Sequence, residues 1–409
     1  MPDPLAPFPA VRGVISTDKR DLTWAATDFG RTVHHRPLAV LRPDSVDDIA
    51  AVQRYATAND LRLVPRAEGH STAGQAQAPG GIVVDMTGLN TVHRVASDHI
   101  VVDAGARWSR VLAATIPHGL TPPVLTDYLE LSVGGTLSVG GLGGASHRHG
   151  AQTDNVLALD VLAPDGTRHT CSPTTNSALF DAVRAGRGRH GIILTATLRL
   201  VPAHTHATVH RLCYANLTDF LADQRTLMNE QRFDYLEGQA QPTDTGPWTL
   251  LIEAATFHSP PDHPDQALHG LRHHNAASNT VPYLNFLDRL AESVALLRRI
   301  GPWQDPHPWL NLLLPDGDTE NIVTTALATT TPELVGDSGL ALLYPLPRAR
   351  ITTPNLRLPQ TPTSFLFSLL RAAPPDSPAT LTRMIDHNHR LINAATAAGG
   401  VAYLGDLDT

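Results

Sequence analysis

The stretch that decides the fold, residues 65–86, reads PRAEGHSTAGQAQAPGGIVVDM. A segment ending in LRLV leads into it, a β-branched run (82–84) leads out, and four glycines lie between them. Glycine has no Cβ, so the backbone at these positions can adopt positive φ and approach a ligand closely. A glycine-rich turn after a strand is a common way to present backbone N–H groups to a phosphate or a ring. The alternative is a surface turn in which His70 is incidental.

A second glycine-rich segment, residues 127–150, reads DYLELSVGGTLSVGGLGGASHRHG and contains seven glycines. This composition is poor for a packed element and good for an anion cradle. The segment matches neither the GxGxxG pattern that opens a Rossmann helix nor the P-loop pattern. A Rossmann site or a nucleoside triphosphatase is therefore disfavoured.

Composition limits the class of protein further. The 409 residues exceed one ordinary domain, and the 42% of hydrophobic residues can build a core. The formal net charge of −8 argues against a nucleic-acid-binding surface. Two cysteines, Cys171 and Cys213, cannot make a disulfide framework and fit a reducing compartment.

The N-terminus lacks the charged and apolar pattern of a secretory signal, and no stretch approaches eighteen consecutive apolar residues. We therefore expect a cytoplasmic protein with neither a membrane nor a nucleic acid as partner. Histidines cluster at 204–210 and 269–274, but no cysteine or carboxylate spacing joins them. Exposed histidines in loops are favoured over a metal site, and no metal is expected.

Short alternating elements fill the first half of the chain. Apolar runs predict strands at 37–42, 61–64, 82–86, 99–105 and 191–201 and a hairpin over 155–171, while helical spacing predicts helices at 46–59, 108–116 and 178–184. After Pro202 the pattern changes to strands at 210–214, 248–254, 306–315, 340–346 and 364–370, with helices at 282–300 and 379–398. We expect an N-terminal arm (1–34), a first domain (35–206) and an α+β second domain (207–409).

Several motifs resemble the cytokinin dehydrogenases, a branch of the vanillyl-alcohol-oxidase-type flavoproteins. The resemblance rests on GHS-x2-GQA-x-APGG-x-VVDM from Gly69, DYL-x-L-x-VGGTLS from Asp127 and RHG-x-Q-x-x-NVL-x-LDV from Arg148. It continues with PHPWLN at 306–311 and YPL at 344–346, and covers nearly the whole sequence from about residue 35 onward. It implies an α+β protein, in which a two-subdomain FAD-binding domain precedes a substrate domain built on an antiparallel sheet.

The resemblance also implies the cofactor, FAD, attached covalently through its 8α-methyl group to His70. Relatives with two covalent links carry a cysteine in the second glycine-rich segment, and this protein has none there, so a single link is expected. The implied flavin-binding set is completed by Pro65, Ala67, Glu68, Gly69, Ser71, Gln75, Asp127, Ser132, Ser138, Leu142, Ile192 and Leu404.

Asp127 occupies the catalytic position of the family. A carboxylate beside the flavin can accept the proton of an amine N–H while hydride leaves the adjacent carbon for flavin N5. Glu253 matches the acid that hydrogen-bonds the purine at the mouth of the pocket. Purely structural roles remain open as alternatives: a helix or turn cap for Asp127, and a cross-strand charge for Glu253. The implied substrate set is completed by Trp309, which could instead be core, and by Asn311, Leu369 and Leu404.

The sequence departs from the family in two places. Ala67 replaces a glycine of the flavin turn, and Glu68 brings a carboxylate near the expected pyrophosphate. The sequence also ends at Thr409, without the tail that in relatives returns to the FAD domain.

The expected activity is oxidation of an N6-isoprenoid adenine, a cytokinin, to adenine and an unsaturated aldehyde, with a quinone or oxygen as electron acceptor. One alternative is an oxidase or dehydrogenase of another amine or alcohol in specialised metabolism. A second is a flavin-binding protein without redox turnover.

Overall fold

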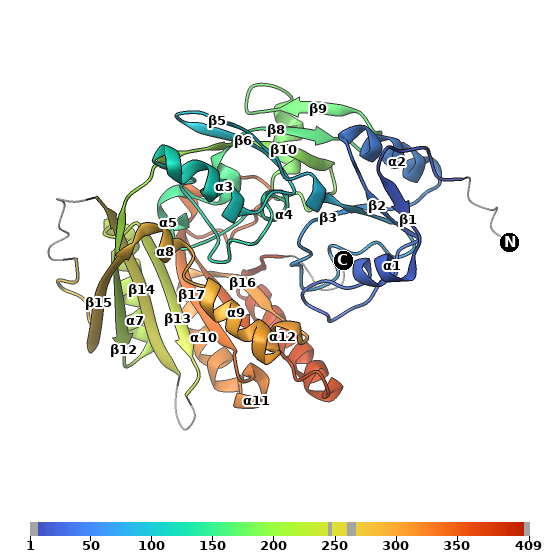
Figure 1. The fold of residues 1–409 in the computed structure, drawn as a ribbon. Coiled ribbons are helices and arrows are strands. Elements are labelled where there is room, and N and C mark those ends of the chain that lie inside the picture. Colours follow the sequence, from blue (N-terminus) through green and yellow to red (C-terminus); the bar gives the residue numbers. More distant parts are fainter. Residues whose placement is uncertain (1–6, 244–247, 260–266, 405–409) are drawn as a thin grey trace.

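The computed structural model describes residues 7–243, 248–259 and 267–404. Within these ranges the strands form sheets of four, five, two and eight strands. Figure 1 shows the four- and five-stranded sheets, drawn in blue and green, on one side of the eight-stranded sheet. Among the described residues, no helix combines the length and the apolar character that crossing a membrane requires.

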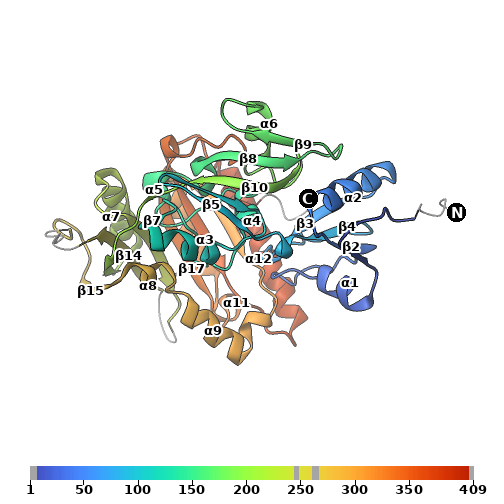
Figure 2. The ribbon, with the colours of Figure 1, turned by 45° about the horizontal axis from the view of Figure 1, so that its top comes forward.

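The four-stranded sheet is a mixed unit with one helix on each face. Its elements are β1 (Val14–Ser16), α1 (Lys19–Ala25), β2 (Ala39–Arg42), α2 (Val46–Ala58), β3 (Leu63–Arg66) and β4 (Ile82–Asp85). The order is β1-β2-β4-β3, with β1 antiparallel to β2 and the other pairs parallel. Successive strand residues point to opposite faces, so Leu41 packs with Ile49 of α2 while Val40 packs with Leu22 of α1. Figure 2 shows the two helices on opposite sides of these strands.

The five-stranded sheet is antiparallel, in the order β5-β6-β10-β8-β9. Its strands and helices are β5 (Val92–Val95), β6 (His99–Asp103), α3 (Trp108–Thr115), α4 (Val133–Leu137), α5 (Ser146–His149), β8 (Val156–Leu162), β9 (Arg168–Cys171), α6 (Ser177–Val183) and β10 (Ile192–Arg199). A small pair, β7 (Leu120–Thr121) and β11 (Val201–Pro202), leads out of this unit. Single 3₁₀ turns follow β4, α3 and α5: η1 (Met86–Gly88), η2 (Ile116–His118) and η3 (Gln152–Asn155).

The eight-stranded sheet is antiparallel at every pairing, in the order β15-β12-β14-β13-β17-β18-β16-β19. Its strands are β12 (His206–Tyr214), β13 (Tyr235–Gln241), β14 (Thr249–His258), β15 (Asn275–Pro282), β16 (Leu310–Pro315), β17 (Leu340–Pro347), β18 (Thr363–Leu370) and β19 (Val401–Ala402). The accompanying helices are α7 (Leu217–Glu230), α8 (Tyr283–Leu287), α9 (Ala291–Ile300), α10 (Asp316–Thr329), α11 (Pro332–Val335) and α12 (Pro378–Ala397), with 3₁₀ turns η4 (Pro302–Gln304) and η5 (Arg348–Arg350).

The two faces of this large sheet have different neighbours. One face packs on α7, α10 and α12, with Phe220, Val323 and Leu391 in a common core. The other face meets the unit formed by the four- and five-stranded sheets, where Leu313 of β16 packs with Leu142. Any group held between the two units therefore contacts alternate residues of these strands.

The α+β prediction is confirmed, and most predicted elements lie where the patterns indicate. The expected arm, 1–34, is different: its described part contributes β1, which pairs with β2, and α1, which covers that sheet. The continuous helix expected over 282–300 is also wrong, because the chain divides into α8 and α9 around Asp288. This interruption directs Arg289 into the site described next.

Candidate active site

His70 lies at the tip of the first glycine-rich turn, within a group of aromatic rings. β3 ends at Arg66, and Gly69 takes φ 63°, the left-handed conformation that turns the chain. The His70 ring stacks on Phe29 at a centroid distance of 3.9 Å, and His307 stacks on the other side of Phe29 at 4.0 Å. Trp303 and Trp309 contact the same rings. Burial lowers the pKa of His70 to about 3, so its imidazole is neutral and nucleophilic at neutral pH.

The buried carboxylate of Asp28 holds this turn in place. It accepts hydrogen bonds from the Ser71 hydroxyl at 2.9 Å and from the backbone N–H of Gly74 at 2.7 Å. Ser71 in turn accepts from the N–H of Ala76, whereas the amide oxygen of Gln75 accepts from that of Ala73. Asp28 belongs to the segment expected to be an arm, and the sequence carried no signal that it reaches the histidine turn.

Glu68 forms an ion pair with an arginine from the unit of the five-stranded sheet. Arg107 donates to the Glu68 carboxylate at 2.7 Å and 3.0 Å and also bonds Glu130. The pair neutralises the carboxylate that was expected to oppose a pyrophosphate. Pro65 and Ala67 lie on either side of Arg66, whose buried guanidinium covers the ring of Trp24 at 4.5 Å.

The second glycine-rich segment serves packing more than anion binding. The N–H groups of Gly134 and Val133 donate to backbone carbonyls of Ala104 and Ala106, so the start of α4 is already satisfied by protein acceptors. A Cβ on Gly144 would lie 2.3 Å from the Tyr235 ring, so only glycine allows the large sheet to approach here. Of the predicted flavin residues, Ser132 caps α4 and Ser138 bonds its last turn, while Leu142 lies between the units and Ile192 is buried with β4.

Asp127 lies in a buried charge network whose other members come from the large sheet and from the α8–α9 interruption. Its Oδ1 accepts from the Tyr235 hydroxyl at 2.8 Å and from Arg289 at 2.7 Å. Arg289 also bonds the Tyr235 hydroxyl and reaches Glu253 at 3.0 Å. A cavity of about 30 Å³, the space of about one or two waters, borders Asp127, Tyr235 and Arg289. The positive charge of Arg289 and hydrogen bonds outweigh burial and lower the pKa of Asp127 below its ordinary value.

Glu253 is brought to the same network, where it lies between two arginines. Arg289 contacts one carboxylate oxygen at 3.0 Å and Arg211 contacts the other at 2.9 Å. Asp127 and Glu253 are therefore joined through one guanidinium, although 126 positions separate them in the sequence.

The predicted substrate residues divide between the two faces of the large sheet. Trp309 contacts the rings around His70. Asn311 accepts from the Ser368 hydroxyl at 2.7 Å on the face toward the unit of the four- and five-stranded sheets. Leu369 follows Ser368 and therefore points the other way, into the core shared with the helices, where it is fully buried. The structure does not bring Leu369 to the site.

The last described residues reach the second glycine-rich segment. The Tyr403 hydroxyl accepts from the N–H of Gly141 at 3.0 Å, and the Tyr403 N–H donates to the Asn311 carbonyl at 2.9 Å. Leu404, predicted to contact the flavin, is the next residue and is half-buried.

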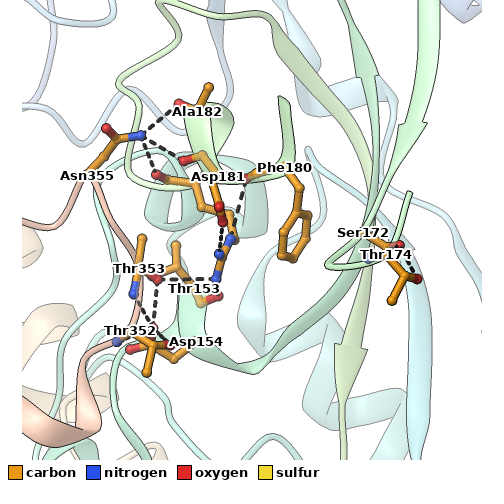
Figure 3. Close-up of polar contacts among 11 residues, drawn as sticks. Thr153, Asp154, Ser172, Thr174, Phe180, Asp181, Ala182, Thr352, Thr353 and Asn355 are labelled. Atoms are coloured by element: carbon orange, nitrogen blue, oxygen red, sulfur yellow. Dashed lines mark hydrogen bonds and ion pairs between the residues drawn. The ribbon is translucent and has the colours of Figure 1, made fainter. Parts of the chain in front are cut away.

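A polar contact between the units holds the loop after β17. The Asp154 carboxylate accepts from the hydroxyl and backbone N–H of Thr353 at 2.7 Å and 2.8 Å. Asn355 donates to the carbonyls of Asp181 and Ala182 at the end of α6 (Figure 3). These bonds join the loop after β17 to the unit that carries the second glycine-rich segment.

The turn fits a flavin nucleotide. Within the described part of the protein, the N–H groups of Gly69, His70 and Ser71 have no protein acceptor, as expected of a backbone cradle for an anionic or carbonyl group. His70 beside them is neutral and surrounded by aromatic surface. The His70 ring lies 5.2 Å from that of Tyr128, the residue that follows Asp127.

Sequence reasoning missed the rings around His70 (Phe29, Trp303 and His307). It also missed Asp28, Tyr235, Arg289 and Glu237, whose carboxyl group accepts from the Tyr235 hydroxyl at 2.8 Å. The one usable signal was the alternation YLEGQ at 235–239, which places a tyrosine and an acid on the same face of a strand. Nothing local distinguishes Arg289 from an exposed helix arginine.

Comparison with known proteins agrees with this geometry. A family model described as FAD binding domain matches residues 37–172, and one described as cytokinin dehydrogenase 1, FAD and cytokinin binding, matches residues 262–406. A xylooligosaccharide oxidase from Myceliophthora thermophila C1 shares the fold, with a TM-score of 0.78 at 19% identity over 96% of this chain and 88% of that one. The fold and the site define an FAD-dependent oxidoreductase.

Closer relatives narrow the assignment. An uncharacterized oxidoreductase of the fasciation locus of Rhodococcoides fascians is 43% identical over 96% of this chain and 89% of its own length. Cytokinin dehydrogenase 10 of Oryza sativa subsp. japonica is 38% identical (81% of this chain, 69% of the relative), and cytokinin dehydrogenase 4 of Arabidopsis thaliana is 32% identical (88% and 78%). The chain belongs to the cytokinin dehydrogenase family.

Proposed function

We propose that this oxidoreductase oxidises the C–N bond between the adenine N6 and the isoprenoid group of a cytokinin, and that its FAD is bound covalently through His70. The observation that carries the proposal is the position of the Asp127 carboxyl group. It is held by Tyr235 and Arg289, and the ring of the next residue, Tyr128, contacts that of His70. The bound flavin would accept the hydride, with oxygen or a quinone as the final acceptor.

The protein residues supply binding and proton transfer. Asp127 would accept the proton of the substrate N–H, which is the task of a positioned general base. Trp309 would offer an aromatic wall, and Glu253 an acceptor for a purine N–H. Water then hydrolyses the released imine to adenine and an aldehyde.

The covalent link has its own support and its own test. A neutral imidazole nitrogen is the chemical form that can bond a methyl carbon, and burial keeps His70 in that form by lowering its pKa. Acid precipitation of the purified protein should leave the yellow colour in the pellet, and the His70→Ala variant should release it to the supernatant. FAD released from the unmodified protein would refute the covalent link.

Asp127→Asn tests the base. The amide keeps the size of the side group but cannot take a proton, so flavin reduction should slow by about 10²–10⁴. A variant that reduces its flavin at the original rate would remove Asp127 from the mechanism.

A specific observation favours a second candidate, oxidation of another amine or an alcohol. Arg289 forms ion pairs with both Asp127 and Glu253, and Arg211 forms a second ion pair with Glu253. A purine would therefore have to share Glu253 with two arginines. Anaerobic mixing with isopentenyladenine discriminates the two: rapid bleaching of the flavin supports the cytokinin, and no bleaching of a dithionite-reducible flavin supports another substrate.

A further inference from the structure

The loop between β17 and β18 encloses a cavity that the mechanism above does not use. The cavity has a volume of about 420 Å³, which lies within the range of about 300–1,000 Å³ that is usual for small-molecule sites. Its lining comes from residues 348–360 and from Val401 of β19. This lining shares no residue with the small cavity beside Asp127 or with the predicted flavin-binding set.

The floor of this cavity is apolar. Leu356 and Leu358 are buried in the cluster that joins the two units, and Ile351 and Val401 pack against the same cluster. A Cβ on Gly140 would lie 3.2 Å from the Leu356 side chain, so the floor backs onto the second glycine-rich segment. An apolar group bound here would therefore bury its surface against the protein, which favours binding.

The rim of the cavity is positively charged. Arg348 and Arg357 line it with exposed side chains, and no acidic residue of the described part of the protein lines it. Within the described ranges neither arginine forms an ion pair, although Arg348 donates to the Pro359 carbonyl at 2.8 Å, a bond that ties its guanidinium to the other arm of the loop. The protein has a net charge of −8, yet its sequence has no acidic residue in the range 338–375. An anion bound at this rim would meet two positive charges.

Hydrogen bonds to the neighbouring unit hold the walls of the cavity in place. The Asp154 carboxylate accepts from the backbone N–H groups of Thr352 and Thr353 at 3.0 Å and 2.8 Å, and Asn355 reaches the end of α6 (Figure 3). The same carboxylate accepts from both threonine hydroxyls, at 2.9 Å and 2.7 Å, and so binds the loop rather than the arginines. Walls that are already ordered lose little conformational entropy when a ligand binds.

We propose that this cavity binds a small organic anion with an apolar body, for which an aromatic carboxylate is the model, at a site separate from the substrate site. The apolar body contacts Leu356 and Leu358. The anionic group hydrogen-bonds Arg348 and Arg357, because planar guanidinium groups match the paired oxygens of a carboxylate or a phosphate. The proposal does not depend on the cytokinin assignment, since no residue of this site belongs to the predicted substrate or flavin set.

Two probes of the same shape test the requirement for a negative charge. Naphthoate combines fused apolar rings with a carboxylate, and naphthamide is its neutral counterpart. Isothermal titration calorimetry of the holoenzyme should give one naphthoate per protein and an affinity for naphthamide that is about tenfold lower or weaker still. Equal affinities for the two probes would overturn the proposal.

A double variant locates the site. Arg348→Gln combined with Arg357→Gln removes both positive charges from the rim, so its affinity for naphthoate should fall to that of the native protein for naphthamide. Arg350→Gln is the matched control, because Arg350 belongs to the same 3₁₀ turn as Arg348 but does not line the cavity. The control should bind naphthoate like the native protein. An unchanged affinity in the double variant would place the bound anion elsewhere and refute the site.

A protection experiment on the native holoenzyme gives a test that needs no variant to fold. Phenylglyoxal modifies accessible arginine side chains, and mass spectrometry of the peptides shows which arginines have reacted. Saturating naphthoate should protect Arg348 and Arg357 and leave Arg350 reactive. The proposal is wrong if naphthoate changes the modification of none of these arginines, or of all three equally.

Discussion

Arg289 connects the two carboxylates of the site, and Arg289→Met removes its charge while keeping a long apolar group. In the native protein its guanidinium bonds Asp127 and Glu253 and lies 4.7 Å over the rings of Tyr235 and Phe286. Methionine can keep part of the ring contact. The variant therefore isolates the loss of the ion pair.

The magnitude follows from what remains of each pair. Glu253 keeps Arg211, so the carboxylate left without a cation is mainly that of Asp127, whose side chain is 21% exposed. Breaking a buried pair costs about 3–5 kcal/mol, and this partial exposure indicates the lower end, about 3 kcal/mol at neutral pH. Arg211→Met is the matched control. Since the Arg211 side chain is 50% exposed, the control should lose less than about 1 kcal/mol.

The pH dependence has a defined sign. Arg289 lowers the pKa of Asp127 in the folded state, which stabilises the protein above the unfolded pKa of about 4 and is lost as the pH falls through the folded value. Without Arg289, burial raises this pKa, so the variant takes up protons at higher pH and its deficit narrows on acidification. Urea unfolding of the native protein and both variants, at pH values between neutral and weakly acidic, measures how this stability deficit changes with pH. Equal stability of Arg289→Met and the native protein at neutral pH would refute the reasoning.

Two further predictions concern the His70 turn. Gly69→Ala puts a Cβ at φ 63° and 2.5 Å from the buried Arg66 Cζ. Its free energy of unfolding should therefore fall by more than the about 1–2 kcal/mol that left-handed strain alone costs, and the variant should bind less flavin. Gly80→Ala, at φ 61° with open space, is the control in thermal unfolding, and equal losses would contradict the clash. Asp28→Ala leaves the Ser71 hydroxyl and the Gly74 N–H without their acceptor. It should lower the stability by about 1–3 kcal/mol and reduce the flavin content, as visible absorbance per protein would show. Full flavin content would show that Asp28 does not organise the turn.

Local patterns in the sequence were sufficient for much of the fold and for one half of the site. Glycines 69 and 74 do adopt positive φ, and the strands and helices around the turn follow the period of their apolar residues. The motif around Asp127 aligned this residue with the catalytic position of the family without any knowledge of its contacts. These features depend on near neighbours in the sequence, which is why the sequence alone revealed them.

The other half depends on contacts between distant segments. Strand register decides which face of β18 meets the unit of the four- and five-stranded sheets. A difference of one residue sends Leu369 to the helices and Ser368 to the site. Arg289 and Tyr235, more than 100 positions away, hydrogen-bond the Asp127 carboxyl group and lower its pKa. Sequence by itself determined the fold class, the glycine-rich turn that carries His70 and the family. Only the tertiary structure decided which charges meet, because sheet register and the packing of the two units bring these residues together.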